Sequence, residues 1–241
     1  MQVIIDSTAK CVNQAAERFS ALLRRKPDAV LGLATGSTPE ALYGKLIEQY
    51  KAGIISFKKV TTFNLDEYVG LNGDHPQSYR HFMQEKLFDH VDIDLKQTHV
   101  PDGVHTTPEN AADYDKMIEA AGGIDLLLLG IGNNGHIGFN EPGSSFDTLT
   151  HIVDLNESTR QANARFFASI SEVPKQAVTM GIHTIMQARS IILMAFGAGK
   201  SQAIAGAVTG PVSADVPASV LRLHPDVTVF VDDGAATDIK V

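Results

Sequence analysis

The sequence predicts an α/β fold: a single-domain, Rossmann-like architecture with a mainly parallel sheet and helices on both faces. Short continuous apolar runs, which are typical of strands buried on both faces, alternate with amphipathic stretches that are typical of helices. The 241 residues contain no internal repeat, low-complexity tract or linker. We therefore expect one domain over residues 1–241.

Each predicted element follows from one of two patterns. Seven continuous apolar runs are expected to be buried strands, at residues 3–5, 29–34, 60–65, 124–132, 151–155, 190–196 and 227–231. Two stretches carry apolar residues at helical spacing, namely Val12, Ala16, Phe19 and Leu23 in the first and Leu42, Leu46 and Tyr50 in the second. Strands that alternate with helices favour parallel pairing.

The composition argues against several classes of function. The formal net charge is −8 and Lys and Arg form no run, which argues against binding to nucleic acid or to an anionic membrane surface. The single cysteine, Cys11, cannot form an internal disulfide, as expected in a reducing compartment. Residues 1–10 lack a signal-peptide pattern, and no apolar run approaches the roughly 20 residues of a membrane span. We expect a soluble, cytoplasmic protein.

A phosphate site is expected beyond the second strand, because ligands of such sheets bind past the carboxyl ends of the strands. We expect Thr38 to cap a helix over residues 40–51, with Pro39 at its first position. Free N–H groups, the helix dipole and three hydroxyls would suit a single phosphate ester at Thr35, Gly36, Ser37 and Thr38. An ordinary helix start fits these residues equally well. The Gly-Lys-Ser/Thr sequence of a nucleoside triphosphate site is missing.

Cations and a carboxylate follow other strands. Lys200, Arg160 and Arg165 are candidates to bind the phosphate because they follow strands, although each taken alone fits a solvated surface residue better. Asp66 and Glu67 come directly after the run 60–65, and one of them should point into the cleft. A carboxylate there could act as a general base, or it could simply cap the next segment.

The segment from Gly130 to Gly135 matches G-x-G-x-x-G, and Asp154 lies near the distance expected for a ribose-binding acid. A dinucleotide site also needs a helix directly after the third glycine. Further glycines and a proline before the strand at 151–155 leave no room for one. We therefore expect neither NAD nor FAD.

The same loop carries a candidate proton-transfer group. His136 can move a proton in either direction near neutral pH, and Glu141 five residues later could fix its tautomer. Asn134 can donate hydrogen bonds but carries no charge. A purely structural histidine is the alternative reading. No pair of histidines has metal-ligand spacing, so we expect no metal site.

These motifs together resemble a known family, the glucosamine-6-phosphate deaminases. The resemblance covers residues from about 28 to 231 and rests on LGLATGSTP, FNLDEYVGL with HPQSY, GIGNNGHIGFNEPGSSF, TRQANARFF and LHPDVTV. It implies a hydrolase that converts glucosamine 6-phosphate and water to fructose 6-phosphate and ammonia in the catabolism of N-acetylglucosamine. No metal or redox cofactor is implied.

The resemblance also implies roles for residues. His136 would open the sugar ring with help from Glu141 and Asn134, and Asp66 would take the C2 proton and return a proton at C1. The phosphate would be held by Thr35, Gly36, Ser37, Thr38, Arg165 and Lys200. Residues from about 156 to 174 resemble the family's mobile lid, which would carry Arg165.

The sequence departs from the family pattern in two ways. Many members have Asp where this chain has Asn134, which puts an all-carboxylate relay to His136 in doubt. The strand at 151–155 lacks the basic residues of allosteric members, and the chain stops at Val241. We therefore expect no activation by an N-acetylated sugar phosphate, and a monomer.

Two alternatives remain. A 6-phosphogluconolactonase-like hydrolase has a similar Gly-rich loop, but it would share neither the FNEP ending nor the NLDEY segment that carry Glu141 and Asp66. A non-catalytic sugar-phosphate sensor would need an attached DNA-binding module, and the expected first strand lies almost at the N-terminus.

Overall fold

A computed structural model of the protein describes residues 1–239, apart from the side chains of Ser158 and Ala162. Within this range the main sheet has seven strands, all parallel, in the order β1-β10-β9-β6-β2-β3-β5. Their bounds are β1 Gln2–Ile5, β2 Val30–Leu33, β3 Thr61–Asn64, β5 Thr98–His99, β6 Leu126–Leu129, β9 Ile191–Ala195 and β10 Val227–Val231. The predicted parallel sheet is confirmed, although the expected domain of residues 1–241 ends outside the described residues.

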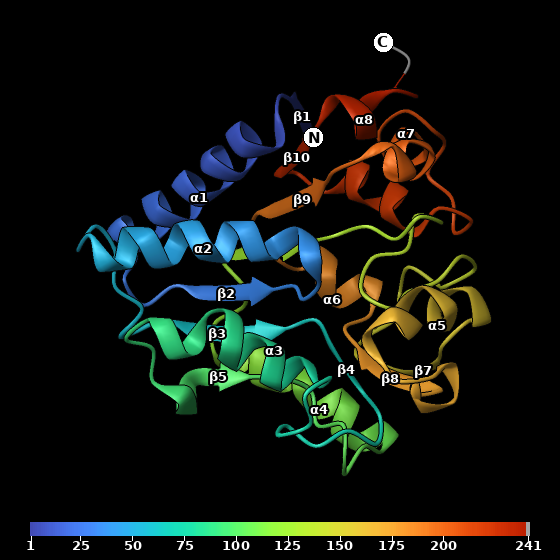
Figure 1. Ribbon diagram of the computed structural model, residues 1–241, viewed down its shortest axis with the longest axis horizontal. Coiled ribbons are helices and arrows are strands. Elements are labelled where there is room, and N and C mark those ends of the chain that lie inside the picture. The colour runs from blue at the N-terminus through green and yellow to red at the C-terminus, as the bar shows by residue number, and fades with distance from the viewer. Residues whose placement is uncertain (240–241) are drawn as a thin grey trace.

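Helices cover both faces of this sheet. Figure 1 shows α1 (Thr8–Arg25), α2 (Ser37–Lys51) and α3 (Tyr79–Lys86) on the near face. The connections that contain α4, α6 and α7 run along the sheet in the direction opposite to those that contain α1, α2 and α3. Because such crossovers are right-handed, these helices lie on the far face, at Pro108–Ala120, Ile182–Met186 and Ser201–Val208. The helical positions predicted in α1 are all buried. A short helix, α8 (Asp233–Ala236), ends the described chain.

The prediction for residues 151–155 as a buried strand is wrong. These residues form β7 (His151–Asp154), which is only partly buried. It pairs antiparallel with β8 (Gln176–Thr179), and β8 pairs antiparallel with β4 (Asp66–Tyr68). A second, three-stranded sheet results. The apolar run in β7 is too short to distinguish a strand buried on both faces from one that is covered on a single face.

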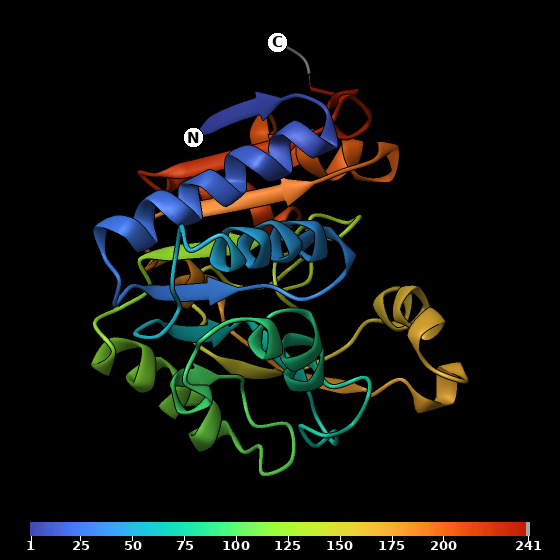
Figure 2. The same cartoon turned by 60° about the vertical axis from the view of Figure 1, so that its left-hand side comes forward.

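The segment between β7 and β8 forms a lobe beside the main body, visible as the gold helix α5 (Glu157–Asn163) in Figure 2. A small apolar cluster separate from the main core lies at the small sheet, with Tyr68, Phe139, Leu155 and Ala177 at its centre. Phe167 of the lobe packs against this cluster. The lobe is therefore attached to the cluster that contains Tyr68, two residues after Asp66.

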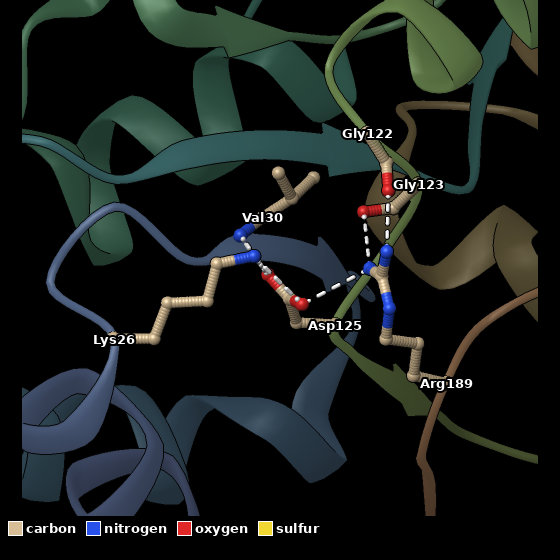
Figure 3. Close-up of polar contacts among 6 residues, drawn as sticks. All are labelled: Lys26, Val30, Gly122, Gly123, Asp125 and Arg189. Atoms are coloured by element: carbon tan, nitrogen blue, oxygen red, sulfur yellow. Dashed lines mark hydrogen bonds and ion pairs between the residues drawn. The ribbon is translucent and has the colours of Figure 1, made fainter.

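An ion triad joins the amino ends of two central strands (Figure 3). Asp125, directly before β6, accepts hydrogen bonds from Lys26 Nζ at 2.7 and 2.9 Å, from Val30 N at 2.8 Å and from Arg189 Nη1 at 3.0 Å. Arg189 also donates to the carbonyls of Gly122 and Gly123. The triad lies at the end of the sheet opposite to the carboxyl ends of the strands, so its role is structural.

The order of the strands identifies where a ligand would bind. After β2 the chain continues to β3 on one side, and after β6 the next strand of the same sheet is β9 on the other side. Adjacent strands whose connections diverge leave a crevice at their carboxyl ends. The loops that follow β2 and β6 are the Gly36 loop and the Gly130–Pro142 loop, so both predicted motifs meet at this crevice. No helix among the described residues combines the length and apolarity needed to cross a membrane.

Candidate active site

The Gly-rich loop begins at the carboxyl end of β6 and forms a compact turn. Gly132 N donates to His136 O at 2.9 Å, and Gly135 N donates to Gly132 O at 3.0 Å. As predicted, no helix follows Gly135 before β7. A Cβ atom at Gly132 would overlap the His136 ring, and Gly135 has a φ of +86° that favours glycine. The glycines therefore make room for the imidazole rather than for a pyrophosphate.

His136 and Glu141 form the predicted pair. His136 Nδ1 lies 3.5 Å from Glu141 Oε2, and both side chains are largely shielded from solvent. Burial alone would raise the pKa of Glu141, but His136, Thr159 and Asn134 together lower it to about 2. Glu141 is therefore ionised at neutral pH. Nδ1 of His136 makes no hydrogen bond among the described residues, and Glu141 is the charged group nearest to it. A carboxylate on the Nδ1 side would favour proton exchange with a ligand at Nε2.

Asn134 contacts the carboxylate and not the imidazole. Its Nδ2 donates to Glu141 Oε2 at 2.6 Å, and its Oδ1 accepts from the backbone N–H of His136 at 3.2 Å. An amide can make both contacts at once because it has a donor and an acceptor. A charged Asp at this position could not donate to Glu141. The asparagine thus suits an ionised Glu141.

Thr159 contacts Glu141, and no feature of the sequence pattern singles it out. Its hydroxyl donates to Glu141 Oε1 from α5, 18 residues along the chain. Thr159 lies in the TRQANARFF segment, but nothing in that pattern indicates which side chain turns inward. Only the folded position of α5 against the loop reveals it.

Asp66 is a buried carboxyl group with no hydrogen-bond partner among the described residues. Burial, followed by the negative charge of Glu67, raises its pKa to about 8. A carboxylate freed from protein hydrogen bonds and partly desolvated is a stronger base than one in water. The arrangement suits proton abstraction from a bound ligand.

Glu67 points to the other side of β4, as the alternation along a strand requires. Its carboxylate accepts from the backbone N–H groups of Tyr68 at 2.8 Å, Tyr79 at 2.9 Å and Arg80 at 3.0 Å. It thereby holds the start of α3 against β4. Of the two acids, Glu67 is structural and Asp66 is the one available for chemistry.

Asp66 lies beside the loop that carries the His–Glu pair. A Cβ built on Gly138, within the Gly-rich loop, would lie 3.7 Å from Asp66 Oδ2. Thr179 pairs with Asp66 across the small sheet, and its hydroxyl accepts from Phe139 N at 3.0 Å. Asn140 Nδ2 ties the loop to the carbonyl of Met180 at 2.8 Å. These contacts fix the loop directly beside the strand that carries Asp66.

The start of α2 differs from the prediction. The helix begins at Ser37 with Gly36 as its N-cap, so the expected cap at Thr38 is wrong. Gly36 has a φ of +103°, which lets the backbone turn into the helix before Thr38 is reached. No side chain caps the helix, and the hydroxyls of Thr35, Ser37 and Thr38 make no hydrogen bond within the described residues. Free first-turn N–H groups at the start of a 15-residue helix have the properties that favour an anion.

Two cations stand near the Gly-rich loop. Lys200 Nζ donates to Ile131 O at 2.8 Å, which ties it to the carboxyl end of β6. Burial, and then the positive charge of Arg165, lower the pKa of Lys200. Arg165 is exposed in the lobe, with its guanidinium 4.7 Å from the Phe166 ring centre. Arg160, in contrast, binds the carbonyls of Ile170 and Val173 and is used within the lobe.

A cavity of about 420 Å³ lies on the opposite side of β4 from Asp66. Glu67, Arg80, His99 and Asp102 are among the residues that line it. Of the residues considered for the site it contains only Glu67, which is used structurally. Asp66, His136 and Glu141 lie outside this cavity.

Comparison with known proteins agrees with this geometry. Residues 5–230 match the family described as glucosamine-6-phosphate isomerases/6-phosphogluconolactonase. A glucosamine-6-phosphate deaminase of Thermoanaerobacter pseudethanolicus is 51% identical over 239 residues, covering 98% of this chain and 94% of that protein. One from a Geobacillus species is 53% identical over 223 residues, covering 92% and 89%.

Solved structures give the same assignment. A monomeric glucosamine-6-phosphate deaminase superposes with a TM-score of 0.95 at 45% identity, over 99% of this chain and 100% of that one. A 6-phosphogluconolactonase from Trypanosoma cruzi gives a TM-score of 0.79 at 22% identity, over 100% and 97%, and shares the fold alone. The chain therefore belongs to the glucosamine-6-phosphate isomerase/6-phosphogluconolactonase family, and within it to the glucosamine-6-phosphate deaminases.

Proposed function

We propose that the protein converts glucosamine 6-phosphate and water to fructose 6-phosphate and ammonia. The observation that carries this proposal is the convergence of two candidate proton-transfer groups in one crevice: Asp66, without a hydrogen-bond partner in the part of the chain that the structure describes, and the His136–Glu141 pair. An aldose–ketose shift needs a base at C2 and a separate group that handles the ring oxygen, and the crevice offers one of each.

The phosphate end of the substrate would bind at α2. The free N–H groups of its first turn and the hydroxyls of Thr35, Ser37 and Thr38 face no protein partner among the described residues. Gly36 lets the backbone approach closely, since a Cβ there would meet nothing within 4 Å. Lys200 and Arg165 would supply the positive charge. Burial and, after it, the charge of Arg165 lower the pKa of Lys200, and an anion between the two cations would relieve their repulsion.

The chemical steps would then be divided between the two groups. His136, oriented through Nδ1 by Glu141, would protonate the ring oxygen and open the pyranose ring. Asp66 would remove the C2 proton of the open aldose and return a proton at C1. The ketimine that results would add water and release ammonia, so that atoms balance without any redox change. No step in this scheme needs a metal or a redox cofactor.

The deaminase is favoured over a lactonase by Asp66 and Glu141. Ring opening and enolisation each need an acid–base group, whereas lactone hydrolysis needs no base at C2. Relatives at 51–53% identity are named deaminases, while the solved lactonases are similar at 22% identity or less. A sugar-phosphate sensor would have no use for the free carboxyl of Asp66.

The finer properties belong to the same proposal. We place the enzyme among hydrolases of cytoplasmic N-acetylglucosamine catabolism, without allosteric activation. The partly exposed strand β7 offers only His151 as a basic residue for an effector. We propose a monomer because the similar deaminase of known structure is described as monomeric. Residues from about 156 to 174 would act as a mobile lid that carries Arg165.

The test is incubation of the purified protein with glucosamine 6-phosphate, without metal or nucleotide, followed by measurement of ammonia and fructose 6-phosphate. We expect the two products in equal amounts. Hydrolysis of 6-phosphogluconolactone without ammonia release would instead establish the lactonase. Asp66→Asn should abolish exchange of the C2 hydrogen with solvent while the substrate still binds, and persisting exchange would exclude Asp66 as the base.

A further inference from the structure

The lobe between β7 and β8 touches the His–Glu pair through one hydroxyl. Thr159 of α5 donates to Oε1 of Glu141, and the two residues are 6% and 8% exposed. A hydrogen bond to an ionised group in a place shielded from water is among the stronger contacts a protein makes. It joins a segment outside the main sheet to the carboxylate that orients His136.

The two oxygens of Glu141 have separate partners. Oε2 lies 2.6 Å from Asn134 Nδ2 and 3.5 Å from His136 Nδ1, while Oε1 accepts from Thr159. A carboxylate held at one oxygen can rotate about its last bond. Once both oxygens are held, the plane of the group is fixed relative to the imidazole. Asn134 alone therefore does not determine the orientation of Glu141.

The lobe has other attachments that do not involve Glu141. Asn163 Nδ2 donates to the Tyr68 hydroxyl at 2.9 Å, and the Phe167 ring meets the Tyr68 ring edge-on at a centroid distance of 5.8 Å. Arg160 closes the lobe on itself through the carbonyls of Ile170 and Val173. Docking of the lobe and the hydroxyl contact can thus be perturbed separately.

We infer that Thr159 is a positioning residue that holds Glu141 against His136, so that proton transfer by His136 depends on the lobe being docked. The inference rests on the proposed function and extends it. It assigns to the lobe a part in preparing the acid–base pair, in addition to carrying Arg165. The residue acts through Glu141 and does not touch the substrate.

The decisive variant is Thr159→Val, which keeps the shape of the side chain and removes the donor. Hydrogen bonds to charged groups correspond to roughly a ten- to hundredfold change, so we expect kcat to fall by that factor with KM nearly unchanged. Thr159→Ser keeps a hydroxyl and should restore most of the activity. The matched control is Thr150→Val, since Thr150 is also buried and its hydroxyl has no partner among the described residues.

A second comparison distinguishes the positioning of Glu141 by Thr159 from a general ordering of the lobe. The groups that face Glu141 are His136 and Asn134 of its own loop and Thr159 of α5. Without the Thr159 donor the charged form of Glu141 is less stable, so the pKa of Glu141, followed by NMR of its carboxyl carbon, should rise. Asn163→Ala weakens the docking of the lobe but keeps the Thr159 hydroxyl, so it should raise KM and change this pKa less. Equal shifts in both variants would refute the positioning role.

Crystal structures of the variants test this inference without relying on the activity assay. In Thr159→Val the carboxylate of Glu141 should rotate away from His136, and in Thr159→Ser it should stay. An unmoved Glu141 in the valine variant overturns the inference even if the enzyme is a deaminase. A wild-type protein that releases no ammonia overturns the proposed function instead.

Discussion

Asp66 Oδ2 lies beside Gly138 of the Gly-rich loop, at 3.7 Å from the position a Cβ atom would take there. The two residues are 72 positions apart in the chain, and Thr179 links them, since it pairs with Asp66 in the small sheet and its hydroxyl accepts from Phe139 N. A Cβ at position 138 would lie only 2.8 Å from the Thr179 hydroxyl. The φ of +58° at Gly138 makes any such side chain strained as well.

The pKa of Asp66 predicts how activity depends on pH. Because the ionised form must act as base and the pKa is raised to about 8, kcat/KM should rise with pH and level off above about 8. Glu67→Gln removes the neighbouring negative charge and should move this limb to lower pH. Rates measured from pH 6 to 9.5 test both statements. A limb that does not respond to Glu67→Gln would assign the ionisation to another group.

Asp66→Asn should stabilise the protein at alkaline pH. The folded-state pKa of about 8 exceeds the unfolded value near 3.8, so the stability contributed by the protonated acid is complete below about pH 4 and is lost as pH rises through 8. The amide avoids this loss. We expect the melting temperature of the variant to exceed that of the wild type by at least about 2 °C at pH 8.5, and to match it at pH 4. Calorimetry at the two pH values is the measurement.

Asn134→Asp should raise the pKa of Glu141. The wild-type amide donates to Glu141 Oε2 at 2.6 Å, whereas a carboxylate would bring a second negative charge to that distance. Two acids so close share a proton, so the pKa of Glu141 should rise from about 2 by on the order of one pH unit. Activity at pH 8 should persist because both groups are then ionised. Titration of the Glu141 carboxyl followed by NMR from about pH 2 to 5 would reveal the shift, and Asn134→Ala serves as the neutral control.

Gly132→Ala should inactivate the enzyme without unfolding it. A Cβ at this position overlaps the imidazole of His136, so the ring has to leave its place beside Glu141. Loss of a positioned acid–base group costs about 10² to 10⁴ in rate. Gly130→Ala is the matched control, since a Cβ there would meet nothing within 4 Å. Comparable kcat values for the two alanine variants would contradict the packing argument.

Much of the fold could be predicted from local pattern alone. The runs at 29–34, 124–132, 190–196 and 227–231 each contain a strand of the main sheet, because strands buried on both faces are continuously apolar. The sequence pattern does not predict β4, because two of its three residues are the acids Asp66 and Glu67. A strand that carries buried acids has no apolar signature.

The site could be predicted only in part. His136 and Glu141 are close in sequence, so their pairing follows from a short loop. The contact of Thr159 with Glu141 depends on how the lobe docks. The N-cap at Gly36 depends on a backbone angle, and the three hydroxyl residues around it are themselves typical caps. Long-range placement and backbone conformation at glycine are what the sequence pattern leaves open.

Asp125→Ala should destabilise the protein while leaving its catalytic constant unchanged. The substitution leaves the buried backbone N–H of Val30 without a partner, whereas Lys26 and Arg189 are 40% and 57% exposed and can turn to water. The cost is therefore that of one unsatisfied donor and the lost charged contacts, about 1–3 kcal/mol in the free energy of unfolding.

The control for this prediction is Asp113→Ala, which removes an exposed pair with Lys116 and should change stability by less than about 0.5 kcal/mol. Urea unfolding of both variants measures the difference, and kcat is measured on the folded fraction. Because Asp125 lies at the amino ends of β2 and β6, opposite to the crevice, a reduced kcat in this variant would mean that strain at one end of these strands reaches the Gly36 and Gly130 loops at the other. An unchanged kcat with lower stability would show that the Asp125 contacts stabilise the sheet without affecting the reaction at its carboxyl edge.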